Sequence, residues 1–187
     1  MNGNIDERLA HVRGRMAEAA RKAGRKPAGI ELVAVTKTHP PEALREALDA
    51  GQTLFGESRV QEAREKRPLV SSRARWHFIG HLQKNKVRQA LPVFEMVQSI
   101  DSLELAREVR RIADEDGQRP RVLLEVNLAG EASKFGFKPA SLEAALETLI
   151  AEMPRLEVLG LMGIPPFSPK AEDSRRYFAA LRGGLQV

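Results

Sequence analysis

The sequence of 187 residues contains no cysteine, few aromatic residues and no long hydrophobic run. Without cysteine, disulfides, thiolate metal sites and cysteine nucleophiles are excluded. No apolar run approaches the ~20 residues that a membrane span requires, and the N-terminal segment lacks the apolar core of a secretory signal. We therefore expect a cytoplasmic protein with no membrane partner.

Several chemical signatures are also missing. The sequence has no P-loop, no glycine-rich dinucleotide fingerprint and no convincing Ser-His-Asp arrangement. His77 and His81 are four residues apart, but they straddle an expected strand and the turn after it, so they do not share a helical face. No cluster of acidic residues accompanies them, and we predict no metal site.

The net charge of +5 is unevenly distributed, with basic residues concentrated in residues 1–30 and 59–90. Such patches bind nucleic acid or a small polyanion, or they are simply solvated surface. Aromatic side chains for base stacking are scarce, at seven Phe, one Tyr and one Trp. We therefore predict no nucleic-acid partner. The competing hypothesis is a basic nucleic-acid-binding module, which salt-dependent retention on a polyanion would reveal.

The chain alternates short apolar runs with helical patterns. The expected strands are 30–35, 53–55, 76–79, 93–97, 122–126 and 156–161. The expected helices are 4–23, 41–50, 58–67, 83–90, 102–116, 141–153 and 172–181. Strands alternating with helices predict a parallel sheet with right-handed crossovers, so the fold class is α/β.

Two ways of closing this sheet compete. A doubly wound sheet favours a glycine-rich turn after the first strand, whereas Val35 is followed by Thr-Lys-Thr-His-Pro-Pro. A (β/α)8 TIM-type barrel places functional residues at the carboxyl ends of several strands, which is the pattern here. Such barrels typically need ~250 residues. We count six strands, and expect a barrel with an extra N-terminal helix that lacks about the last two strands.

Lys37 and Ser58 are the first candidate site residues. Lys37 ends the most apolar strand, where desolvation would favour the neutral amine that forms a Schiff base. The alternative is a lysine that reaches solvent. Ser58 follows Phe55-Gly56-Glu57 at a strand-to-helix junction, where it either caps the next helix or binds a ligand.

His81 and Met162 lie at two further strand ends. The His81 ring is a candidate wall for an aromatic ligand. Met162 is a candidate to lie beneath a flat ring, and the alternative is ordinary core packing. A βα loop with interleaved phenylalanines and lysines, residues 133–138, lies between them in the sequence.

Five motifs occur in order: VAVTK ending at Lys37, FGESRVQE at 55–62, WHFIGHLQKNK at 76–86, VNLAGEASKFGF at 126–137 and GLMGIPPF at 160–167. Over nearly its whole length the sequence resembles the pyridoxal 5′-phosphate (PLP) homeostasis family, single-domain relatives of the alanine racemase N-terminal barrel. The resemblance implies a cofactor, PLP, held as a Schiff base on Lys37. It also implies a monomeric carrier and regulator in vitamin B6 and amino-acid homeostasis, without established turnover.

The sequence departs from the family pattern in two places. The family usually reads Phe-Gly-Glu-Asn where this chain has Ser58, and its later Ser-Met-Gly-Met-Ser and Val-Arg-Ile-Gly segments do not occur. We therefore expect residues 1–187 to form a single PLP-binding barrel domain, incomplete at its C-terminus. That form should bind PLP weakly, if at all. It should also be less stable than a complete relative, or else cover its open sheet edges by self-association.

The alternative function is a PLP-dependent amino-acid racemase or lyase. Racemases of this fold use a second base, typically a tyrosine from a separate domain, and Tyr177 is the single tyrosine here. Tyr177 falls in the expected last helix and we expect no second domain to supply such a base, which favours the carrier over the enzyme.

Overall fold

The computed structural model describes residues 4–131 and 134–183. Its contacts divide the chain into two compact units, Met1–His77 and Phe78–Val187, and each is described by itself. In the described residues, no helix is both long enough and apolar enough to cross a membrane.

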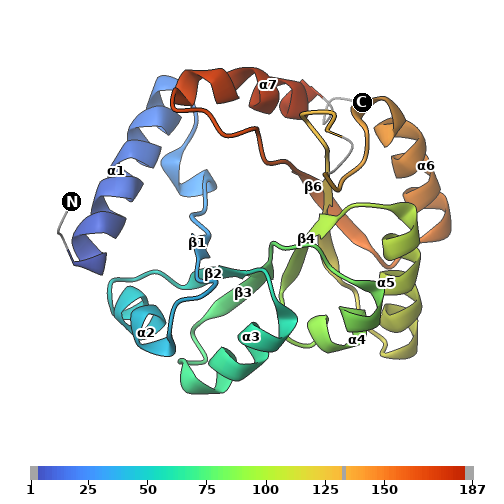
Figure 1. The fold of residues 1–187 in the computed structure, drawn as a ribbon, viewed down its shortest axis with the longest axis horizontal. Helices are drawn as coiled ribbons and strands as arrows, with labels where there is room; N and C mark the ends of the chain where they lie inside the picture. Colours follow the sequence, from blue (N-terminus) through green and yellow to red (C-terminus); the bar gives the residue numbers. More distant parts are fainter. Residues whose placement is uncertain (1–3, 132–133, 184–187) are drawn as a thin grey trace. The chain divides into compact units, whose positions relative to one another are not determined.

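The first unit contains three strands and three α-helices. The elements are α1 (Ile5–Lys22), β1 (Ala34–Val35), α2 (Pro41–Asp49), β2 (Leu54–Glu57), α3 (Val60–Lys66) and most of β3 (Arg75–Phe78). Short 3₁₀ turns cover Pro27–Gly29 and Arg67–Leu69. β1, β2 and β3 follow one another across the sheet in chain order, and β1 pairs with β2 in parallel. The helices lie outside these strands (Figure 1).

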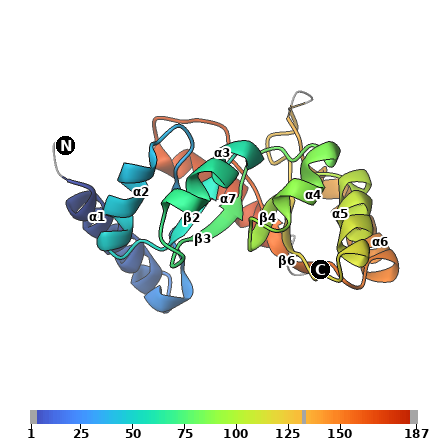
Figure 2. The same ribbon diagram turned by 90° about the horizontal axis from the view of Figure 1, so that it is seen from below.

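The second unit repeats the same pattern. It contains α4 (Val87–Ala90), β4 (Met96–Ile100), α5 (Leu103–Glu115), β5 (Arg121–Glu125), α6 (Leu142–Glu152), β6 (Glu157–Met162) and α7 (Arg175–Gly183). The 3₁₀ turns are Lys84–Lys86, Pro139–Ser141 and Ala171–Ser174. β4 pairs with β5, and β5 with β6, both in parallel. α5 and α6 lie side by side (Figure 2).

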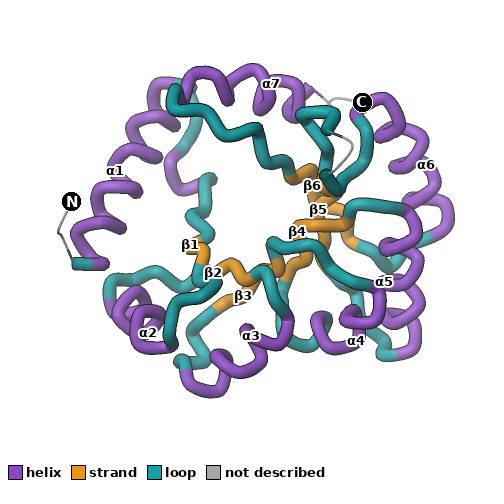
Figure 3. The backbone as a smooth tube through the Cα atoms, viewed as in Figure 1, coloured by secondary structure: helices purple, strands orange, loops and turns teal. Residues whose placement is uncertain are grey.

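The predicted alternation of strands and helices is confirmed, with shifted boundaries. The first expected strand, 30–35, shrinks to two paired residues, because residues 30–33 make no ladder with β2. The fourth moves from 93–97 to 96–100, since Val93 and Phe94 lie in a turn after α4. A long loop joins β6 to α7, drawn in teal in Figure 3.

The apolar faces of the helices explain their packing. α5 buries Leu105, Ala106, Val109, Ile112 and Ala113, which recur at helical spacing. Its N-terminus is capped by Ser102, whose Oγ accepts a hydrogen bond from the Leu105 backbone N–H at 3.2 Å. The helix therefore begins with a side-chain cap.

Candidate functional site

Lys37 lies two residues beyond the end of β1, in a tight turn that leads to α2. Its side chain is exposed, so the expected desolvation by apolar neighbours is wrong. β1 ends too early to enclose the lysine, and Val35 beside it is itself 49% exposed. Within residues 4–131 and 134–183, the Lys37 amine has no hydrogen-bond or ion-pair partner and is free to react.

The residue after Lys37 has a strained backbone. Thr38 has a φ of 66°, in the left-handed region that a β-branched residue rarely adopts. Its backbone N–H donates a hydrogen bond of 2.6 Å to Glu62 Oε1 on α3. Strained residues of this kind persist where surrounding contacts hold them, and they concentrate at functional sites.

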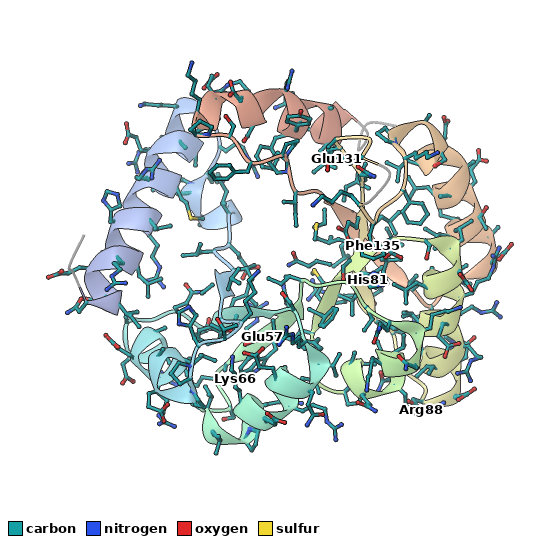
Figure 4. The ribbon with its side chains drawn as sticks, in the orientation of Figure 1. Glu57, Lys66, His81, Arg88, Glu131 and Phe135 are labelled. Carbon is teal, nitrogen blue, oxygen red and sulfur yellow. The ribbon has the colours of Figure 1, made fainter. Side chains whose placement is uncertain are left out.

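Beneath this turn lies a buried group of charged side chains that sequence reasoning missed. The Lys66 amine donates to Glu57 Oε1 at 2.7 Å and to Glu62 Oε1 at 2.6 Å. Figure 4 shows Glu57 and Lys66 side by side. The Glu57 side chain is fully buried and that of Lys66 is 7% exposed. The four-residue spacing of Glu62 and Lys66 on one helix was the available signal.

The pKa of Glu62 is set by opposing effects. Burial acts to raise it, but hydrogen bonds from Lys66 and the Thr38 N–H, with the charges of Lys66 and Arg59, outweigh burial. The pKa of this carboxyl therefore lies below its ordinary value, and the group is a carboxylate at neutral pH.

Ser58 lies just past the end of β2 and is half-buried. Of the two interpretations of Ser58, a helix cap or a ligand contact, the helix cap is wrong. α3 starts at Val60 with Arg59 in the capping position, and no side chain caps it. The Ser58 hydroxyl is therefore not committed to the helix, and its predicted contact with a ligand remains a prediction.

His81 follows β3, in the second unit. Its Nδ1 lies 2.9 Å from Asp101 Oδ2, and its ring stacks on Phe135 with centroids 3.7 Å apart. Figure 4 shows the two rings together. One face of the expected aromatic wall is therefore covered by a residue of the same chain, from the loop after β5.

Glu125 ends β5 near the same pair. Burial is the main cause that raises the pKa of its carboxyl, the charge of Asp101 raises it further, and His81 acts in the opposite direction. Glu125 also lines a pocket of about 490 Å³. The pocket's other walls come from the loops after β5 and β6, including Asn127, Phe135 and residues 164–167.

Met162 is the last residue of β6 and is half-buried. Its backbone carbonyl accepts a hydrogen bond of 2.8 Å from the Val126 N–H, which extends the pairing of β5 with β6. Each of the four predicted residues, Lys37, Ser58, His81 and Met162, thus lies at or just past the carboxyl end of a strand. Their assignment to a ligand remains a prediction.

Comparison with known proteins identifies close relatives. The family model for the alanine racemase N-terminal domain matches residues 8–186. The pyridoxal phosphate homeostasis protein of Aquifex aeolicus is 40% identical over 180 residues, which cover 96% of this chain and 78% of that protein. The Escherichia coli K12 protein of the same name is also 40% identical, over 95% of this chain and 76% of its own length.

Solved structures agree with these relatives. PipY of Synechococcus elongatus with PLP bound superimposes with a TM-score of 0.83 at 38% identity, covering 96% of this chain and 79% of PipY. Alanine racemase from Clostridium difficile, at 14% identity and a TM-score of 0.69, shares the fold.

Proposed function

This chain belongs to the pyridoxal phosphate homeostasis protein family, which has the fold of the alanine racemase N-terminal domain, and on that premise we propose that it binds PLP and acts in PLP and amino-acid homeostasis. A relative that shares 38% of its sequence binds PLP in a solved structure. The expected family is confirmed, and the cofactor is proposed on this kinship.

The exposed amine of Lys37 supports its assignment as the residue that attaches PLP. Lys37 presents an exposed amine with no partner among the described residues, at the position where the family motif VAVTK ends. A bound PLP supplies an aldehyde, and the chemistry of that group matches a primary amine that is free to react. We assign Lys37 as the residue that attaches the cofactor as a Schiff base, with loss of one water molecule.

The other proposed contacts have separate tasks. Ser58 offers a hydroxyl that no helix cap occupies. His81 offers a ring and Met162 a thioether for the flat face of a cofactor. These three assignments rest on the positions of the family motifs in the sequence.

The protein acts as a carrier under this proposal, and the alternative is a PLP-dependent racemase or lyase. The Tyr177 hydroxyl lies on α7 and accepts a hydrogen bond of 3.0 Å from Arg176.

We place the protein in the cytoplasm. We also retain self-association through sheet edges: in the described residues β1 pairs only with β2, β6 pairs only with β5, and Val35 and Leu159 on them are exposed.

An absorbance titration with PLP tests the proposal, using the unsubstituted chain and Lys37→Ala. We expect an imine band in the first and its loss in the second. Borohydride reduction followed by peptide mass mapping should place the label on Lys37. Equal labelling of many surface lysines, unchanged in Lys37→Ala, would refute the assignment, and racemisation of an added L-amino acid would favour the enzyme.

A further inference from the structure

The buried charged group beneath Lys37 contacts the backbone on both sides of that lysine. Lys66 Nζ donates a hydrogen bond of 2.7 Å to the carbonyl oxygen of Thr36. Thr36 Oγ1 in turn donates to Glu57 Oε1 at 2.8 Å. On the other side, the Thr38 N–H donates to Glu62 Oε1 at 2.6 Å. Lys37 itself makes none of these contacts through its side chain.

Burying these charged side chains costs desolvation free energy. Taking a carboxylate and an ammonium out of water costs several kcal/mol each, and an apolar pair of similar volume is often at least as stable. Here Glu57 Oε2 is also buried without a hydrogen-bond partner in the described part of the chain. A group of this kind is weak evidence for stability, and its contacts with Thr36 and Thr38 indicate another role.

The amine of Lys66 is fully hydrogen-bonded, unlike that of Lys37. All three N–H donors of Lys66 are directed at oxygen atoms, of Thr36, Glu57 and Glu62, and its side chain is nearly inaccessible. An amine attacks an aldehyde through a free electron pair, which a buried ammonium with three acceptors does not offer. Lys66 is thereby excluded as an attachment site.

We propose that Lys66, Glu57 and Glu62 are positioning residues that hold the Thr36-Lys37-Thr38 turn, and with it the Lys37 amine, in the geometry required for cofactor attachment. The inference rests on the proposed function, because it assumes that Lys37 is the attachment residue. The strained backbone of Thr38 is the structural sign of this role, since the ion-paired Glu62 holds it directly.

The first experiment uses Glu62→Ala, with Glu65→Ala as its matched control. Both residues lie on α3, but Glu65 is exposed and bonds Gln61, away from the turn. Without PLP, we expect the Thr38 amide to exchange its hydrogen about tenfold faster in Glu62→Ala, because a charge-assisted hydrogen bond is lost. We expect PLP binding to weaken by a similar factor, and the control to change neither quantity.

A double variant, Lys66→Met with Glu57→Gln, removes the buried charges while keeping the volume of the side chains. We expect it to remain folded by circular dichroism, yet to bind PLP about tenfold more weakly and to show less borohydride label on Lys37. A merely structural role would lower the melting temperature without moving the Thr38 exchange rate or the yield of label in the folded protein.

The outcomes separate the two proposals. Unchanged Thr38 exchange in Glu62→Ala, or PLP binding as tight as in the unsubstituted chain for either folded variant, would overturn the positioning role while Lys37 kept its label. PLP binding as tight in Lys37→Ala as in the unsubstituted chain would instead overturn the proposed function and, with it, any role of the group in attachment.

Discussion

The imidazole of His81 lies almost parallel to the phenyl ring of Phe135, with an angle of 11° between the two planes. Asp101 holds the same imidazole through Nδ1. The histidine ring is thus fixed at its edge by a carboxylate and covered on one face by a residue from the loop after β5. An aromatic ligand that uses this face must first displace Phe135.

Replacing Phe135 with alanine should free the covered face of His81. We expect the ring protons of His81 to shift in the NMR spectrum, because the neighbouring ring current is lost. Stability should fall by no more than about 1 kcal/mol, since Phe135 is 54% exposed. If PLP uses this face, its binding should tighten a few-fold. The control is Phe178→Ala on α7, a similarly exposed ring; an identical His81 shift in both variants would contradict the stacking.

Ser58→Asn restores the amide that the family usually has at this position. Asparagine offers donors and an acceptor with longer reach than the serine hydroxyl. We expect tighter or unchanged PLP binding in an absorbance titration. The melting temperature should change little, because Ser58 caps no helix. A large loss of PLP binding would show that the serine makes a contact of its own.

Two serines that look alike in sequence should differ in their contribution to stability. Ser102 caps α5 through the Leu105 N–H, whereas no side chain caps α6 at Ser141. We expect Ser102→Ala to lower the free energy of unfolding by about 1 kcal/mol. Ser141→Ala should have a smaller effect, and urea denaturation of both variants compares them directly. Equal losses would rule out the capping bond as the cause.

The raised pKa of Glu125 predicts a pH-dependent stability. The pKa is higher in the folded than in the unfolded chain, so ionisation of this carboxyl opposes folding. The free energy of unfolding therefore falls as pH rises from the unfolded pKa through the folded pKa. Glu125→Gln should therefore raise the melting temperature at neutral pH. At pH values well below the ordinary pKa of 4.5, the carboxyl is protonated in both the folded and the unfolded chain, and the rise in melting temperature should vanish. A gain that is the same at every pH would point to packing instead.

The fold was predictable from the sequence because the order of strands and helices depends on local patterns. Periodicity does not distinguish a buried strand from a buried turn, however. Phe94 shows the difficulty: it is buried and packs edge-on against Phe78, yet it lies in a turn before β4. The apolar residues 30–33 are the reverse case, since only Ala34 and Val35 find a strand partner.

The candidate site was predictable in its positions and less so in its environment. Strand ends identify Lys37 and His81 as candidates, but burial depends on neighbours that are distant in the sequence. Lys37 is exposed, while Lys66 on α3 is buried. Thr38 and Glu62 are 24 residues apart, and only the folded chain brings them into contact.

The backbone around Gly136 leaves no room for a side chain. Its φ is 113°, and an added Cβ would lie 2.8 Å from the Asn127 nitrogen and 2.9 Å from the Glu125 carbonyl oxygen. These are backbone atoms of β5 and its extension, where Phe137 bridges to Val126. They do not move without breaking that pairing.

We expect Gly136→Ala to lower the free energy of unfolding by at least about 2 kcal/mol, through strain and steric overlap together. The matched control is Gly130→Ala in the same loop, where φ is 68° but the space is open. It should cost only about 1 kcal/mol. In Gly136→Ala the His81 ring protons should also shift as in Phe135→Ala, because Phe135 directly precedes Gly136 in the chain. Equal stability of the two glycine variants, measured by urea denaturation, would show that the close approach of Gly136 to β5 is absent in solution.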